Sequence, residues 1–213
     1  MRLHGYWRSG TAYRVRIALA LKGVAYETVA HDLRTGAQRS ETYRALNPQG
    51  LVPALETDSG AVLVQSPAIL EWLEERYPAP PLLPGDPDAR AVVRAMAATV
   101  ACDVHPLNNL RVLNALRGEF GADDAGVNRW IARWIGDGFA ALEVMIGVHG
   151  DGFAWGAAPT IADCCLVPQV YAAERFAVDV SPYPRLMAAA TRARALPAFA
   201  AAHPDVQPDA DRA

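Results

Sequence analysis

Five prolines fall within ten residues, and they constrain the fold more than any other feature of the chain. Proline lacks a backbone N–H and its ring collides with the preceding helical turn, so no helix continues through such a stretch. A proline-rich segment between two patterned regions is typical of a linker. We therefore predict one domain over residues 1–80, a linker over 81–87 and a second domain over 88–213. The prolines are Pro78, Pro80, Pro81, Pro84 and Pro87.

The first 80 residues alternate between strand and helix patterns. Leu3–Trp7 reads as a strand, Tyr13–Lys22 as a helix and Tyr26–Ala30 as a second strand, which is a βαβ unit. Val52–Glu56 and Ala61–Val64 are separated by residues of turn composition, which indicates a β-hairpin. We predict a small α/β domain.

Helical patterns dominate after residue 66. Ser66 followed by Pro67 favours a helix start, with Ser66 as the N-cap of a helix over Ala68–Tyr77. Beyond Asp88 the alanine-rich amphipathic pattern predicts an all-α second domain. Its predicted helices are Ala89–Val104, Ala125–Val148, Ile161–Phe176 and Pro184–Ala195.

Two features of the second domain bear on folding. Thr160 and Asp163 have the spacing of a capping box, in which the hydroxyl and the carboxylate each satisfy a backbone amide at a helix start. We interpret this pair as structural. The tail from His203 to Ala213 is rich in proline and aspartate, so we expect it to be loosely ordered.

Composition excludes several classes of protein. Of 213 residues 52% are hydrophobic, and the formal net charge is −3, which offers no general attraction to nucleic acid or to an anionic membrane. The apolar stretches are short or interrupted, so none is expected to span a bilayer. Cys102, Cys164 and Cys165 suit neither a disulfide framework nor a metal site. We expect buried thiols, a cytoplasmic protein and no bound metal.

The segment Trp7–Thr11 lies where the first strand passes into the first helix. Backbone amides and the helix dipole favour an anion there, and a thiolate is one such anion. A hydroxyl of Ser9 or Thr11 can stabilise a thiolate, while Arg8 adds positive potential. The alternative is that these hydroxyls are simple N-caps.

Two further segments favour ligand binding. Pro53 enters a strand after Gln49 and Val52, and a cis peptide at that point leaves the preceding backbone available to an extended ligand. An ordinary turn with an edge-strand proline explains the pattern equally well. Gln65 and Ser66 stand at another helix start, where amides and a hydroxyl can hold a carboxylate unless Ser66 is only a cap.

The order of these motifs resembles that of the zeta-class glutathione transferases. The resemblance begins with the run from Trp7 to Leu19 and extends over nearly the whole chain. The further matching segments are Asn47-Pro48, Val52–Leu55, Gln65-Ser66, Asp103–Asn109 and Ala162–Val170.

The resemblance implies a thioredoxin-like N-terminal domain with a cis proline at Pro53, a helical C-terminal domain, a homodimer and bound glutathione. Many zeta enzymes have serine-serine-cysteine where this chain has Ser9-Gly10-Thr11. This departure favours Ser9 over Thr11 as the thiolate partner.

The family also implies an activity. Its members include maleylpyruvate and maleylacetoacetate isomerases, in which glutathione thiolate adds to a cis alkene, the resulting enolate rotates and the sulfur leaves. The implied catalytic group is Arg8, Ser9 and Thr11. The implied glutathione contacts are Gln49, Val52, Pro53, Gln65, Ser66, His105 and Asn109, and the implied substrate contacts are Arg8, Arg111 and Arg175.

Several alternatives remain open from the sequence. The same thiolate also serves a general transferase that conjugates or dehalogenates electrophiles, and the fold also suits a noncatalytic binding protein. His105 is either a ligand contact or a structural helix-end residue. Maleylpyruvate and maleylacetoacetate share the cis alkene between carboxylate and keto groups, so the choice between them stays open.

Overall fold

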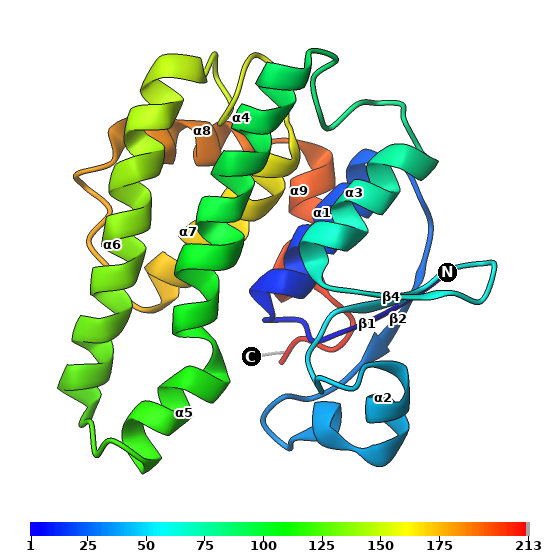
Figure 1. Ribbon diagram of the computed structural model, residues 1–213, viewed down its shortest axis with the longest axis vertical. Coiled ribbons are helices and arrows are strands. Elements are labelled where there is room, and N and C mark those ends of the chain that lie inside the picture. Colours follow the sequence, from blue (N-terminus) through cyan, green and yellow to red (C-terminus); the bar gives the residue numbers. More distant parts are fainter. Residues whose placement is uncertain (212–213) are drawn as a thin grey trace. The chain divides into compact units, whose positions relative to one another are not determined.

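The computed structural model describes residues 1–211 and divides into two compact units. The first unit combines Met1–Leu82 with the chain from Ala195 onward, and the second comprises Leu83–Arg194. The chain therefore enters the helical unit near the predicted linker and returns to the first unit at its end (Figure 1).

The first unit is built on a four-stranded sheet of order β2-β1-β3-β4. β1 (Arg2–Gly5) pairs in parallel with β2 (Glu27–Ala30), and β3 (Ala54–Glu56) pairs antiparallel with both β1 and β4 (Val62–Val64). The predicted βαβ unit and hairpin are confirmed. This mixed sheet is the core of the expected thioredoxin-like domain.

Helices cover both faces of the sheet within this unit. α1 (Gly10–Leu21) and α3 (Ser66–Arg76) pack together on one face, and α2 (Glu41–Leu46) lies on the other (Figure 1). α1 is buried almost all round, from Ala12 to Leu19, because α9 (Pro197–Ala202) also packs against it. A helix enclosed on all sides carries no one-sided apolar stripe.

α2 was not expected, because the sequence there shows only a polar stretch. Ser40 caps the helix, its Oγ accepting a hydrogen bond from the backbone N of Tyr43 at 3.2 Å. Within α2, which the structure describes in full, Tyr43 is the only buried residue. One buried side chain in six residues gives too weak a periodic signal to reveal a helix.

The second unit is helical. α4 runs into a π-helical turn and then a short 3-10 helix, and α5 is a helix that the sequence pattern did not predict. The elements are α4 (Pro87–Ala98), η2 (Thr99–Val104), η3 (His105–Asn108), α5 (Leu110–Gly118), α6 (Asp124–His149), α7 (Ile161–Arg175) and α8 (Pro184–Arg194). No helix in residues 1–211 is both long and apolar enough to cross a membrane.

The predicted capping box at the start of α7 is confirmed. The Asp163 carboxylate accepts from the backbone N of Ala154 and of Thr160, both at 2.8 Å, and from Thr160 Oγ1 at 3.2 Å. Asp163 is fully buried, and this burial raises its pKa to about 6 against the opposing effect of its hydrogen bonds. Cys164 and Cys165 follow it into the core as predicted, whereas Cys102 is exposed, contrary to the expectation of buried thiols.

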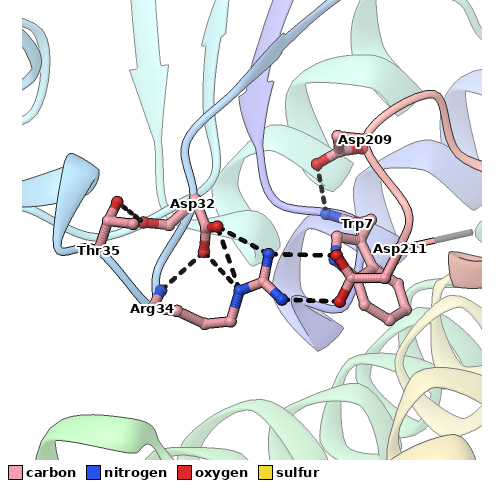
Figure 2. A network of polar contacts seen from close by, with 6 residues as sticks. All are labelled: Trp7, Asp32, Arg34, Thr35, Asp209 and Asp211. Atoms are coloured by element: carbon pink, nitrogen blue, oxygen red, sulfur yellow. Dashed lines mark hydrogen bonds and ion pairs between the residues drawn. The ribbon is translucent and has the colours of Figure 1, made fainter.

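The prediction of a loosely ordered tail is wrong for residues up to Asp211. Pro204–Val206 forms a 3-10 turn, and two aspartates then contact the N-terminal part of the same unit (Figure 2). Asp209 accepts from the backbone N of Trp7 at 2.9 Å, and Asp211 accepts from the Arg34 guanidinium at 2.7 Å. Polar composition suggested disorder, but the polar groups have partners distant in sequence. Residues 212–213 lie outside the described residues.

Candidate functional site

The predicted thiolate site lies at the start of α1. Ser9 is the N-cap, and its Oγ accepts from the backbone N of Ala12 at 3.3 Å. Ser9 Oγ also lies 2.9 Å from Thr11 Oγ1, which in turn donates to the carbonyl oxygen of Val52 at 2.9 Å. The fold therefore joins three predicted site residues from two separate segments.

The hydroxyls of Ser9 and Thr11 have different roles, because each carries only one proton to donate. A hydroxyl carries one proton, and that of Thr11 is given to the Val52 carbonyl. Thr11 must then accept in its contact with Ser9, so Ser9 is the donor. Ser9 can turn this proton toward an anion while still accepting from Ala12, whereas Thr11 would have to release Val52. The geometry favours Ser9 as the anion partner, in agreement with the sequence.

Arg8 adds a cation beside this turn. Its guanidinium carbon lies 5.2 Å from the centre of the Trp7 ring, a cation–π geometry that restricts the side chain. The backbone of Trp7 is itself held by Asp209 of the tail, which the sequence did not indicate (Figure 2). The tail therefore helps to position the segment that carries Arg8 and Ser9.

The loop before β3 is organised around one carbonyl oxygen. The Tyr43 hydroxyl and the Asn47 side-chain amide both donate to the carbonyl of Leu51, at 2.7 Å and 2.6 Å. Leu51 precedes the Val52–Pro53 peptide, which is cis as predicted. Tyr43 was missed as a site residue; the only signal was a single tyrosine in a polar stretch.

The segment before α3 differs from the prediction in one detail. Gln65, not Ser66, is the N-cap, with φ at +68°, and it makes no side-chain capping bond. Ser66 is the first helical residue and is buried, and its Oγ accepts from the buried guanidinium of Arg14 at 3.3 Å. Ser66 as N-cap is therefore wrong, because its hydroxyl is used by a side chain that lies 52 residues away in sequence.

Gln65 nevertheless connects two predicted glutathione contacts. Its Nε2 donates to Gln49 Oε1 at 2.7 Å, so the loop before β3 and the start of α3 meet. Both glutamines are exposed. Within the first unit, one set of hydrogen bonds therefore joins Ser9, Thr11 and Val52, and a second joins Gln49 to Gln65.

The other predicted residues belong to the helical unit. Asn109 caps α5, with Oδ1 accepting from the backbone N of Arg111 at 3.1 Å, and Arg111 is exposed in the first turn. His105 begins η3. Arg175 ends α7, with its guanidinium carbon 4.2 Å from the centre of the Phe176 ring. Histidine, asparagine and arginine are residue types that can bind anions, and the roles of these four residues stay predictions.

Comparison with known proteins identifies the family. Residues 8–76 match the model of the glutathione S-transferase N-terminal domain. The chain is 53% identical to a maleylacetoacetate isomerase of Pseudomonas aeruginosa, over 98% of each chain. The solved structure of a maleylpyruvate isomerase, described as a bacterial zeta-class glutathione S-transferase, matches with a TM-score of 0.96 and 51% identity, over 99% of this chain and 100% of that one.

A second solved structure holds a ligand of interest. It is a maleylacetoacetate isomerase from Anaeromyxobacter dehalogenans with bound dicarboxyethyl glutathione and citrate in its active site. It matches with a TM-score of 0.88 and 46% identity, over 99% of this chain and 97% of that one. With relatives this similar along nearly its full length, the chain belongs to the zeta class of the glutathione transferases.

Proposed function

We propose that this protein catalyses the glutathione-dependent cis–trans isomerisation of a maleyl dicarboxylate, maleylpyruvate or maleylacetoacetate, to its fumaryl isomer. The observation that carries the proposal is the Ser9 hydroxyl at the start of α1, whose proton can be turned to a thiolate without loss of its bond from Ala12. In a chain of this family, the thiolate is that of glutathione.

The reaction needs no net oxidation and no net proton. The thiolate forms a carbon–sulfur bond to one alkene carbon, and the π electrons move to the conjugated carbonyl oxygen as an enolate. The former double bond is now single and rotates. The enolate then re-forms the alkene as the carbon–sulfur bond breaks, which returns the thiolate.

The ligand of the Anaeromyxobacter enzyme supports this route. Dicarboxyethyl glutathione has the connectivity that results when a glutathione sulfur adds across the double bond of a butenedioate. It therefore represents the addition stage, with a proton in place of the enolate's negative charge. An active site that accommodates this adduct is consistent with reversible thiolate addition.

The residues divide into three roles. Ser9 stabilises the thiolate, with the amides at the start of α1, and Thr11 holds the Val52 carbonyl. Arginines suit the substrate because a planar guanidinium can grip a carboxylate through two hydrogen bonds, and the same charge opposes that of the enolate. The substrate arginines are Arg8, Arg111 and Arg175, and the glutathione contacts are Gln49, Val52, Pro53, Gln65, Ser66, His105 and Asn109.

The division of labour follows the predicted domains. Residues 1–80 supply most of the glutathione contacts, and the helical unit adds His105 and Asn109 together with two of the three substrate arginines, Arg111 and Arg175. We also propose a homodimer, which light scattering of the purified protein would test. A cytoplasmic location fits three cysteines that form no disulfide within residues 1–211, and fractionation of cells that produce the protein would test it.

An absorbance assay with each substrate, with and without glutathione, tests the function. The expected result is isomerisation that requires glutathione and leaves its concentration unchanged. Consumption of glutathione would indicate conjugation or dehalogenation instead, and glutathione binding without turnover would indicate a binding protein. The ratio of kcat/KM for the two maleyl compounds identifies the preferred substrate.

A further inference from the structure

Two histidines of the first unit, His4 and His31, lie where strands β1 and β3 face helix α2. His4 of β1 is buried, and its Nδ1 lies 2.9 Å from Nε2 of His31, which follows β2. The other nitrogen of His4, Nε2, lies 2.5 Å from Glu56 Oε1 on β3. Glu56 Oε2 accepts from Arg2 at 2.6 Å. Polar contacts thus connect four side chains in a row, in the order Arg2, Glu56, His4 and His31.

The geometry limits how many protons the pair can hold. The hydrogen bond from His4 and the bond and charge of Arg2 lower the pKa of Glu56, so Glu56 is ionised and His4 Nε2 carries a proton toward it. Only one proton fits between His4 Nδ1 and His31 Nε2. The bond therefore survives with one imidazolium in the pair. If both rings are cationic, two N–H groups face each other and the bond is lost.

Burial, followed by the charge of His4, lowers the pKa of His31 below its ordinary value of 6.5. His31 is therefore neutral in the folded protein at neutral pH. A lowered histidine pKa means that the favourable interaction is present at higher pH and is lost as pH falls through the folded-state pKa. The second proton consequently enters the pair only at a pH below the ordinary pKa of a histidine.

The pair is in contact with the glutathione loop through Tyr43. The ring of His31 lies 4.3 Å from that of Tyr43, measured between centroids, and the ring of His4 lies 5.9 Å from it. The Tyr43 hydroxyl donates to the carbonyl of Leu51, which directly precedes Val52 and Pro53. Tyr43 is also the single buried residue of α2, so a displaced Tyr43 moves the helix and the carbonyl together.

Other titratable groups near the pair do not replace this effect. Burial raises the pKa of Tyr43 to about 12, so its hydroxyl stays neutral. Asp32, next to His31 in sequence, is bound to Arg34. Glu41 and Arg44 of α2 and Glu27 of β2 are exposed. Among residues 1–211, Glu56 is the acidic side chain that is hydrogen-bonded to the pair.

We propose that His4 and His31 are positioning residues that make glutathione binding depend on pH: one shared proton supports Tyr43 and the Leu51 carbonyl, and a second proton separates the rings and disturbs the loop. The inference rests on the proposed function only in that the loop from Gln49 to Pro53 holds glutathione. A pair of like charges in a part-buried site provides the driving force, because neither charge is well solvated there.

Calorimetric titration with S-methylglutathione tests the proposal. Its sulfur cannot ionise, its carboxyl groups titrate below about pH 4 and its amino group above about pH 7, so a pH dependence between about pH 5 and pH 7 originates in the protein. For the unmodified protein we expect the affinity to fall about ten-fold from the upper to the lower end of this range, as for one group whose pKa differs by about one unit between free and bound protein.

Two variants locate the effect, and one serves as a control. His31→Gln keeps an amide that can bond to His4 Nδ1 but takes up no proton, so its affinity should be independent of pH and close to the unmodified protein's at neutral pH. Tyr43→Phe keeps the ring and removes the bond to Leu51, so its pH dependence should shrink. His149→Gln, at the exposed end of α6, should behave as the unmodified protein.

The outcomes are separable. A pH-independent affinity of the unmodified protein, or a full pH dependence in His31→Gln or Tyr43→Phe, would overturn the positioning role and leave the isomerase proposal standing. An absence of S-methylglutathione binding at every pH would overturn the glutathione site itself. A ten-fold loss that His31→Gln and Tyr43→Phe reduce and His149→Gln retains would support the proposal.

Discussion

Helices α1 and α7 both begin at a hydroxyl N-cap, yet the two caps differ in what their protons can do. At α1, Ser9 is part-exposed and its proton goes to another hydroxyl, that of Thr11. At α7, Thr160 is buried and its proton goes to Asp163, which is fully buried and accepts two further backbone bonds. The comparison favours Ser9 for the proposed chemistry, because its proton can change partners at a lower cost than that of Thr160.

The largest expected effect is the loss of the α7 cap. Asp163→Ala leaves three donors without an acceptor in the core, which should lower the free energy of unfolding by about 3 kcal/mol or more. Urea denaturation measures this loss. Asp163→Asn keeps one acceptor oxygen and should be less destabilised. A loss below about 1 kcal/mol in the alanine variant would contradict the structural role.

Ser9→Ala should show the opposite profile. It removes the proposed donor to the thiolate, so turnover should fall roughly ten- to hundred-fold, the range for a hydrogen bond to a charged group. The free energy of unfolding should fall by only about 1 kcal/mol, as for a lost N-cap. Steady-state kinetics and denaturation of the same preparation test both. Full activity at every pH would remove Ser9 from the thiolate site.

Replacing each proposed substrate arginine tests whether substrate binding and glutathione binding depend on different residues. Replacement by methionine keeps much of the side-chain volume and deletes the charged fork, so kcat/KM should fall about ten-fold or more while glutathione binding changes less. Lysine should recover only part of the loss, because it lacks the planar fork. The variants are Arg8→Met, Arg111→Met and Arg175→Met. Normal isomerisation by the last two would exclude the proposed dicarboxylate clamp.

Thr11→Val should have the smallest effect. It removes the bond to the Val52 carbonyl but leaves Ser9 Oγ accepting from the backbone N of Ala12, so turnover should fall by about two- to five-fold, as for a neutral hydrogen bond. Thr11→Ser keeps the hydroxyl and is the matched control. If the valine variant loses more turnover than Ser9→Ala, the assignment of the two hydroxyls is reversed.

Much of the site was predictable because its signals are local. The turn at Ser9 and the capping box of Asp163 each depend on residues close together in sequence, whereas the cis peptide before Pro53 was implied by the family resemblance. The same holds for the hairpin of β3 and β4 and for the proline-rich linker. Local backbone preferences and short-range hydrogen bonds can be predicted from the types and spacing of neighbouring residues.

The amino-acid sequence alone determined the two-part organisation, the main helices and strands, and the family. Only the tertiary structure revealed three contacts. Ser66 accepts a hydrogen bond from the Arg14 side chain, and Asp209 accepts one from the backbone N of Trp7. The rings of His4 and His31 are hydrogen-bonded across 27 positions of sequence. The tertiary structure also revealed that the Thr11 hydroxyl donates to the Val52 carbonyl, which distinguishes the role of Thr11 from that of Ser9. These partners come from distant segments, and packing of the whole unit brings them within hydrogen-bond distance, which no local pattern encodes.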